Sequence, residues 1–151
     1  EIGLESTVVD CTSDVPRVLR SGSVPIEQLR RIIPKTEMFE GDVVEAPRSP
    51  GLRHRHYSPR AKVVLVNFKS EISNLKFGQD TDRTAYIGMN QPVGCFETRQ
   101  ICESVNEYAH SIFEFFRECD RRGIGTIYCE RVEESGIGFA LMDRLRRAAA
   151  D

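Results

Sequence analysis

The sequence lacks several features that would assign a protein to a familiar class at once. No run of apolar residues approaches the roughly 20 that cross a bilayer, and the first residues do not have the basic-then-apolar order of a secretion signal. The five cysteines have no C-x-x-C spacing, which argues against a zinc site and against a disulfide framework. These absences predict a cytoplasmic protein with no membrane partner, whose cysteines are reduced and mostly buried in the core.

Acidic residues are also absent from a long central segment, which carries six basic side chains. The segment runs from Ala46 to Ser70, whereas the whole chain of 151 residues is nearly neutral, with 21 basic and 23 acidic side chains. It is therefore a local basic arm on a slightly acidic body, and its natural partner is an anion. This favours recognition of a phosphate-sized group and leaves RNA contact open. The basic residues are Arg48, Arg53, Arg55, Arg60, Lys62 and Lys69.

Within this arm, the stretch SPGLRHRHYSP at residues 49–59 concentrates titratable side chains between prolines and a glycine. Such a segment is neither a helix nor an ordinary strand, and loops of this kind are usually binding surfaces. His54 and His56 could form a metal pair, but a zinc site needs three or four protein ligands and the neighbours are arginines, so we expect no tightly bound metal. An anion clamp fits better, because arginine, protonated histidine and the hydroxyl and ring of Tyr57 all suit a nucleotide or phosphate.

The beginning of the chain predicts a small β-hairpin followed by a helix. Two β-branched runs, at residues 6–10 and 16–20, are separated by a polar turn at 11–15, and residues 26–33 have helical spacing that ends at Pro34. The hydroxyls of Ser6 and Thr7 would then meet the guanidinium of Arg20 at one end of the hairpin. There they could hold phosphate oxygens, although ordinary edge-strand residues are the alternative. Because IGLESTVVD already reads as a strand-forming region, we expect the chain to be an N-terminally truncated piece of a longer protein.

The second part of the chain alternates strands with helices after a stretch, residues 35–60, that has no apolar periodicity. Continuous apolar runs predict buried parallel strands at 62–68, 84–89 and 125–130. Amphipathic patterns predict a long helix within 103–123, capped by Gly123, and a last helix within 136–150. The pattern predicts a small parallel α/β domain of Rossmann-like layering. The expected apolar face of the long helix is Val105, Tyr108, Ala109, Ile112, Phe113, Phe116 and Cys119.

Two further patterns have plain structural explanations. Gly136 and Gly138 give only G-x-G, which favours a turn and cap ahead of the last helix over a nucleotide site. Arg144, Arg146 and Arg147 are typical of a solvated helix face, with RNA contact as the alternative.

Four segments taken in order are more specific than any one alone. GLESTVVD, VLRSG, SPGLRHRHYSP and IYCERVEESGIGFALMDRLRRAA resemble the C-terminal half of the long, two-domain form of threonylcarbamoyl-AMP synthase, in the YrdC-like translation-factor family. The resemblance implies that residues 1–34 are the C-terminal remnant of a YrdC-like α/β catalytic domain. It implies that residues 35–60 are an interdomain linker with an active-site lid, and that residues 61–151 are a Rossmann-like C-terminal domain.

The resemblance also implies residue roles. Ser6 and Arg20 match positions that line the nucleotide site, and His56 with Tyr57 match the histidine-tyrosine pair of the lid. The family has a proline after the arginine where this sequence has Ser21, and often an aromatic residue at the position of His54, so no role is carried over to His54. No catalytic residue is assigned, because the K-x-R motif and S-x-N segment of the family precede the region that resembles this chain.

The implied activity is that of a nucleotidyltransferase. Members of the family bind ATP, L-threonine and bicarbonate, make threonylcarbamoyl-AMP and pyrophosphate with Mg²⁺ accompanying the nucleotide, and supply the tRNA-modification machinery. We expect the chain by itself to be inactive, because the upstream motifs are outside it. The alternative is an RNA-binding or regulatory α/β module without catalysis, which the basic arm and the arginines of the last helix would serve.

Overall fold

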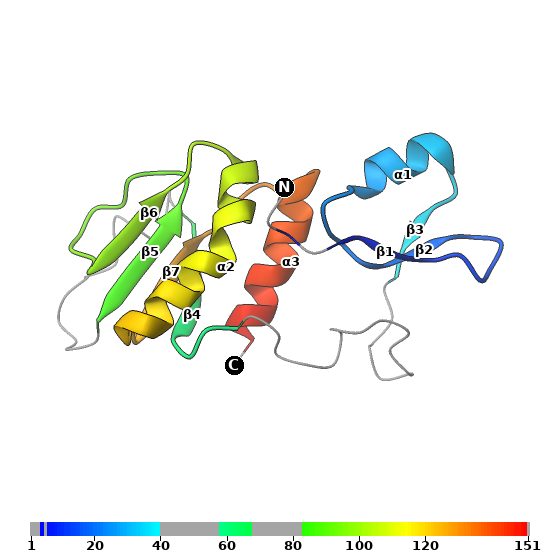
Figure 1. The fold of residues 1–151 in the computed structure, drawn as a ribbon. Coiled ribbons are helices and arrows are strands. Elements are labelled where there is room, and N and C mark those ends of the chain that lie inside the picture. The colour runs from blue at the N-terminus through cyan, green and yellow to red at the C-terminus, as the bar shows by residue number, and fades with distance from the viewer. Residues whose placement is uncertain (1–3, 5, 40–57, 68–82, 151) are drawn as a thin grey trace.

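The computed structural model describes residues 4, 6–39, 58–67 and 83–150, which form two sheets and three helices (Figure 1). The first sheet contains β1 (Val8–Asp10), β2 (Arg17–Arg20) and β3 (Glu37–Met38), with helix α1 (Ile26–Ile32) between β2 and β3. The second sheet contains four parallel strands, and helices α2 and α3 pack against it. The predicted mixed α/β fold with a small parallel sheet is confirmed.

The first sheet begins with the predicted hairpin. β1 pairs antiparallel with β2, in a register that places Val8 opposite Arg20 and Asp10 opposite Arg17. The carboxylate of Asp10 accepts hydrogen bonds from the backbone N–H and the hydroxyl of Thr12, at 2.9 and 2.7 Å. An aspartate that bonds the chain two residues later favours a tight turn, which explains why the chain reverses there.

The strand β3 lies inside the stretch that the sequence predicts to be linker. It pairs parallel with β2: the N–H of Glu37 donates to the carbonyl of Pro16 at 3.0 Å, and that of Phe39 donates to Val18 at 3.1 Å. Two residues are too few to give a periodic signal, so the sequence could not reveal this strand. The first sheet therefore continues past α1.

Helix α1 forms where predicted, but its apolar side chains are at most half-buried. None of its residues is buried, and Ile32 is 81% exposed. Three neighbours, Val24, Ile33 and Phe39, are also exposed. The first sheet thus has little hydrophobic core of its own among the described residues; its fully buried side chains there include Val18 and Thr36.

The second sheet has the strand order β4-β7-β5-β6. All neighbouring strands are parallel. The strands β4 (Lys62–Val66), β5 (Thr84–Gly88) and β7 (Thr126–Glu130) confirm the three predicted apolar runs, whereas β6 (Thr98–Ile101) was not predicted. β6 is the last strand of the described sheet, and its alternate residues are exposed, so its sequence TRQI gives no apolar run.

Each helix on this sheet has a definite start and end. Ser104 caps α2 (Val105–Arg122), since its hydroxyl accepts the N–H of Glu107 at 3.1 Å. Gly123 ends α2 in the left-handed conformation, with φ of 66°, as predicted for a C-terminal cap. Helix α3 (Ile137–Ala149) follows Gly136, whose φ is 53°.

The main core lies between one face of the second sheet and both helices. Val63, Ala85, Ile87, Ile127 and Cys129 point from the sheet into this core, and α2 and α3 contribute to the same cluster. Figure 1 shows the two helices side by side over that face, in agreement with their mutual contacts. The predicted face of α2 is buried at Tyr108, Ala109, Ile112, Phe116 and Cys119, and only partly buried at Val105 and Phe113, while Phe115 is an additional buried residue.

No helix within the described parts of the chain combines the length and the apolar character that a bilayer crossing requires.

Candidate functional site

Ser6 and Arg20, the two site residues that the sequence predicts in the hairpin, lie next to each other: Ser6 shortly before β1, and Arg20 at the end of β2. The guanidinium of Arg20 donates from Nε and Nη2 to the carbonyl oxygen of Ser6, at 3.3 and 3.2 Å. The register of the hairpin causes this contact, because Arg20 lies opposite Val8 at the start of β1. The structure thus places Ser6 next to Arg20, but the arginine holds the main chain of Ser6, and the hydroxyl of Thr7 bonds to Val24. The side chain of Ser6 is exposed.

Thr7 fixes the turn that follows β2 against the start of β1. Its hydroxyl donates to the carbonyl of Val24 at 2.8 Å and accepts the N–H of the same residue at 3.1 Å. Residues 21–24 are thereby held next to Ser6 and Arg20. We call these four residues, Ser6, Thr7, Arg20 and Val24, the corner of the first sheet.

The corner has the chemistry of an anion site. An exposed hydroxyl beside an oriented guanidinium is suited to phosphate oxygens, because the charged donor binds more strongly than a neutral one and its direction is already fixed. The pairing of Thr7 with Val24 could not be read from the sequence, since it depends on how the turn after β2 folds back.

The other two predicted site residues, His56 and Tyr57, lie outside the described residues, as do His54, Arg53 and Arg55. The described residues on either side of them are anchored. On one side Phe39 is bonded to β2, and on the other the N–H of Arg60 donates to the carboxylate of Asp120 at 2.8 Å. Asp120 lies near the end of α2, so the arm is attached at Arg60 to the helices of the second sheet.

A buried carboxylate that the sequence analysis did not single out lies at the carboxyl end of β7. Glu130 is 4% exposed and accepts hydrogen bonds from the hydroxyl of Tyr86 (2.7 Å), the N–H groups of Met89 (2.7 Å) and Asn90 (2.9 Å), and the side-chain amide of Asn90 (2.5 Å). Burial and the bond to Glu130 raise the pKa of Tyr86 well above its ordinary value.

This carboxylate tethers the chain that leaves β5. The carboxyl ends of parallel strands often carry ligand-binding residues, but both oxygens of Glu130 already accept bonds from the protein. In the part of the chain that the structure describes, no buried side-chain polar atom is without a partner. The cluster is therefore structural. Its sequence signal is the glutamate that ends an otherwise apolar strand, in IYCE.

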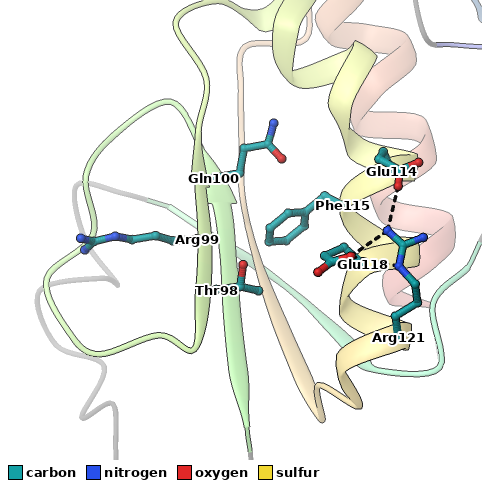
Figure 2. Close-up of a pocket in the computed structure, with 7 residues that line it drawn as sticks. All are labelled: Thr98, Arg99, Gln100, Glu114, Phe115, Glu118 and Arg121. Carbon is teal, nitrogen blue, oxygen red and sulfur yellow. Dashed lines mark hydrogen bonds and ion pairs between the residues drawn. The ribbon is translucent and has the colours of Figure 1, made fainter.

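A shallow groove of about 300 Å³ lies between β6 and α2 (Figure 2). Phe115 lies between the strand and the helix, and Thr98, Arg99 and Gln100 line the groove from β6. The side chain of Arg99 is directed away from α2 in Figure 2. Arg121 bonds to both Glu114 (2.9 Å) and Glu118 (2.7 Å). Hydrogen bonds from Arg117 and Arg121 lower the pKa of Glu114, and hydrogen bonds from Arg122 and Arg121 lower the pKa of Glu118. Both carboxylates of the groove are thus paired with arginines, and the groove has no cluster suited to catalysis.

The two glycines of the G-x-G pattern, Gly136 at the N-cap of α3 and Gly138 in its first turn, have structural roles, as the sequence interpretation holds. Gly136 has a positive φ, and the N–H of Gly138 donates to Ser135 at 2.9 Å. A Cβ on Gly138 would lie 2.2 Å from the carbonyl oxygen of Glu133, so only glycine fits there.

The arginines of α3 pair with acidic side chains. Arg146 bonds to Glu134, and Arg147 bonds to Asp143 at 3.1 Å. Both are exposed, as predicted for a solvated face. Arg144 is different, because its side chain is only 12% exposed and bonds to Asp143 at 3.4 Å.

Among the described residues there is no group of three or more histidine, cysteine, aspartate or glutamate side chains that could hold a metal ion. All five cysteines are unpaired. Cys102, Cys119 and Cys129 are buried, as predicted for core residues, whereas Cys11 and Cys95 are exposed. Burial raises the pKa of Cys102 to about 11 and that of Cys119 to about 12, so these thiols are protonated at neutral pH.

Comparison with known proteins identifies the family. The model of the family described as "Threonylcarbamoyl-AMP synthase, C-terminal domain" matches residues 24–150. The threonylcarbamoyl-AMP synthase of Pyrococcus abyssi is 34% identical over 158 residues, covering 98% of this chain and 46% of its own length. Those of Bacillus subtilis and Schizosaccharomyces pombe are 28% and 27% identical, and the match covers 46% and 43% of their lengths. The chain therefore spans less than half of these relatives.

Comparison with solved structures gives the same family. The crystal structure of P. abyssi Sua5 complexed with L-threonine superimposes with a TM-score of 0.86 at 33% identity, over 99% of this chain and 46% of that one. A structure of the P. abyssi protein with a histidine and the adjacent tyrosine replaced by alanine gives the same TM-score at 32% identity. The chain thus belongs to the threonylcarbamoyl-AMP synthase C-terminal domain family.

Proposed function

We propose that the chain is part of a nucleotidyltransferase that makes threonylcarbamoyl-AMP and pyrophosphate from ATP, L-threonine and bicarbonate. The observation that carries this proposal is the match to threonylcarbamoyl-AMP synthases across 98% of the chain. The chain corresponds to 46% of the first of these relatives, so the complete active site needs residues beyond it. For the same reason we propose that the 151 residues alone do not catalyse the reaction.

In this proposal Ser6 and Arg20 bind the nucleotide. Support comes from the corner of the first sheet, where Arg20 is oriented by the carbonyl of Ser6 and the side chain of Ser6 is exposed. A guanidinium fixed in this way stabilises negative charge on phosphate oxygens without having to reorganise during the reaction. Its role is to bind and orient the phosphates while pyrophosphate leaves.

His56 and Tyr57 act in this proposal as part of a lid. The sequence contains one His-Tyr pair, and a histidine and the adjacent tyrosine are the residues replaced in the variant of the P. abyssi protein. A lid that excludes water would protect a carbamoyl adenylate from hydrolysis. We retain the corresponding division into residues 1–34, 35–60 and 61–151 as part of the proposal, with β3 belonging to the first sheet.

Among the described residues no group of three or more possible ligands offers a metal site of the protein's own. In this proposal a magnesium ion accompanies ATP, since Mg²⁺ in such reactions is held largely by substrate phosphates. We further propose that the product serves tRNA modification in the cytoplasm, where five unpaired cysteines are expected. Contact between RNA and the basic arm belongs to the same proposal.

The test compares the 151-residue chain with a longer chain that includes the region preceding it in its reading frame. We expect only the longer chain, and not the 151-residue chain, to release pyrophosphate. This release should depend on ATP, L-threonine and bicarbonate. Arg20→Ala in the longer chain should raise KM for ATP by about tenfold or more, because one charge-assisted contact is lost. Arg17→Ala is the matched control, since Arg17 is exposed on the same strand.

The proposal fails if the longer chain releases no pyrophosphate under these conditions, or if Arg20→Ala and Arg17→Ala have equal effects. Binding of tRNA by a longer chain that shows no synthesis would favour the RNA-binding module instead.

A further inference from the structure

A side chain that lies four residues before β1 joins the two sheets. Leu4 is half-buried, and it packs against the hydrophobic core of the second sheet and its helices. Leu4 therefore attaches the chain ahead of the first sheet to the second sheet and its helices.

This contact lies close in sequence to the corner of the first sheet. Ser6 follows Leu4 by two residues, a span of at most about 7 Å in an extended chain. On its other side Ser6 is held by Arg20, and the next residue, Thr7, is held by Val24. Leu4 contacts the core of the second sheet, while Ser6 and Thr7, which follow it closely in the chain, belong to the corner.

The first sheet has little packing of its own to fix the position of this segment. Helix α1 buries none of its residues. By contrast, the core against which Leu4 packs contains fully buried side chains, among them Ile112, Ile127 and Leu141. A side chain seated in a rigid core restrains the backbone next to it more strongly than exposed hydrogen bonds do.

We propose that Leu4 is a positioning residue, through which the second sheet and its helices hold Ser6, and with it the guanidinium of Arg20, in place for the nucleotide. Its effect on nucleotide binding rests on the proposed function of Ser6 and Arg20. Its effect on the backbone of residues 6–9 does not. The domain formed by the second sheet then supports the site without contributing a group that touches the nucleotide.

The test uses Leu4→Ala, with Leu4→Met as the conservative variant and Val132→Ala as the matched control. Val132 is also half-buried and packs against the same core, but it lies in the segment before α3. The first measurement is amide hydrogen exchange of residues 6–9 in the 151-residue chain. Leu4→Ala should increase exchange there by about three- to tenfold, the size expected when a partly buried leucine loses its outer carbons. Leu4→Met and Val132→Ala should stay within about twofold of the parent.

The second measurement is steady-state kinetics of the longer chain. Leu4→Ala should raise KM for ATP by about three- to tenfold and change kcat by less than about twofold, with recovery in Leu4→Met. Equal exchange at residues 6–9 in Leu4→Ala and Val132→Ala would overturn the positioning role. Faster exchange with an unchanged KM would overturn its link to the nucleotide. If the parent makes no product, the proposed function fails, while hydrogen exchange still decides whether Leu4 holds the corner.

Discussion

Gly88 is the position where a single added carbon should do most damage to the second sheet. It is the last residue of β5, and it lies beside the buried cluster around Glu130. A Cβ on Gly88 would lie 2.4 Å from Oε2 of Glu130, 2.5 Å from Cβ of Glu130 and 2.5 Å from the hydroxyl of Tyr86. All three separations are far below van der Waals contact, so Gly88→Ala requires a rearrangement.

None of these neighbours can move away at little cost. Oε2 of Glu130 accepts bonds from Tyr86, Met89 and Asn90, and Cβ of Glu130 is fixed to the backbone of β7. The hydroxyl of Tyr86 ends a rigid ring that is fully buried. Overpacking of a core costs about 1–3 kcal/mol, and loss of one hydrogen bond to a charged group costs about 1.5–3 kcal/mol. We therefore expect Gly88→Ala to lower the free energy of unfolding by about 3–5 kcal/mol.

Urea unfolding of the 151-residue chain, followed by circular dichroism, measures this change. Gly136→Ala is the control, because a Cβ there meets nothing within 4 Å and only the positive φ of 53° is unfavourable. With ψ of −126° this conformation lies outside the left-handed helical region, and the strain should cost about 1–3 kcal/mol. In a Glu130→Ala background the cost of Gly88→Ala should fall, since Oε2 is gone, but not to zero, since Cβ of residue 130 remains. Equal costs for Gly88→Ala and Gly136→Ala would refute the reasoning.

Three other results are expected. Because folding raises the pKa of Cys102 to about 11 and that of Cys119 to about 12 from ordinary values near 9, the unfolded thiols lose protons first as pH rises. The free energy of unfolding should therefore fall from pH 9 towards pH 11. Cys102→Ala should make the urea midpoint less dependent on pH in this range. An unchanged dependence would show that the buried thiol of Cys102 does not cause the loss of stability. Replacing His56 and Tyr57 by alanine in the longer chain should change the unliganded stability by no more than about 0.5 kcal/mol and lower the rate by roughly 5- to 150-fold. A loss of thermal stability with unchanged activity would contradict the lid. Residues 61–151 should give a dispersed NMR spectrum on their own, since their strands and helices share one core, and a collapsed spectrum would place the domain boundary elsewhere.

The sequence was informative where burial and local chemistry act together. β4, β5 and β7 lie within a sheet whose core face is covered by helices, so their apolar runs stand out. Gly123 and the start of α2 follow from local capping rules. β6 and β3 were missed for different reasons: β6 has the alternating pattern of an exposed strand, and β3 is two residues long.

That Ser6 and Arg20 lie close together could be predicted from the sequence, because β1 and β2 are neighbours in the chain and pair as a hairpin. The pairing brings Arg20 to the start of β1, although an irregularity between Val8 and Val9, which the sequence did not predict, shifts the register there. The cluster around Glu130 could not be predicted in this way. This cluster forms only because β7 pairs with β5, although β6 and α2 separate these two strands in the chain. No local sequence pattern specifies that Tyr86 and Glu130 will meet.

The strand order β4-β7-β5-β6 has a consequence for how the protein folds during synthesis. In the described sheet β4 pairs with β7, and the first of these pairs joins Lys62 to Thr126. β4 therefore leaves the ribosome long before its partner, and β5 can pair with β6 but has one edge open until β7 arrives. Pairings between distant parts of a chain form slowly, and unpaired strand edges promote association with other chains. The nascent chain is thus most exposed to aggregation while α2 is being translated, and insertion of β7 between its two neighbours is the step that ends this interval.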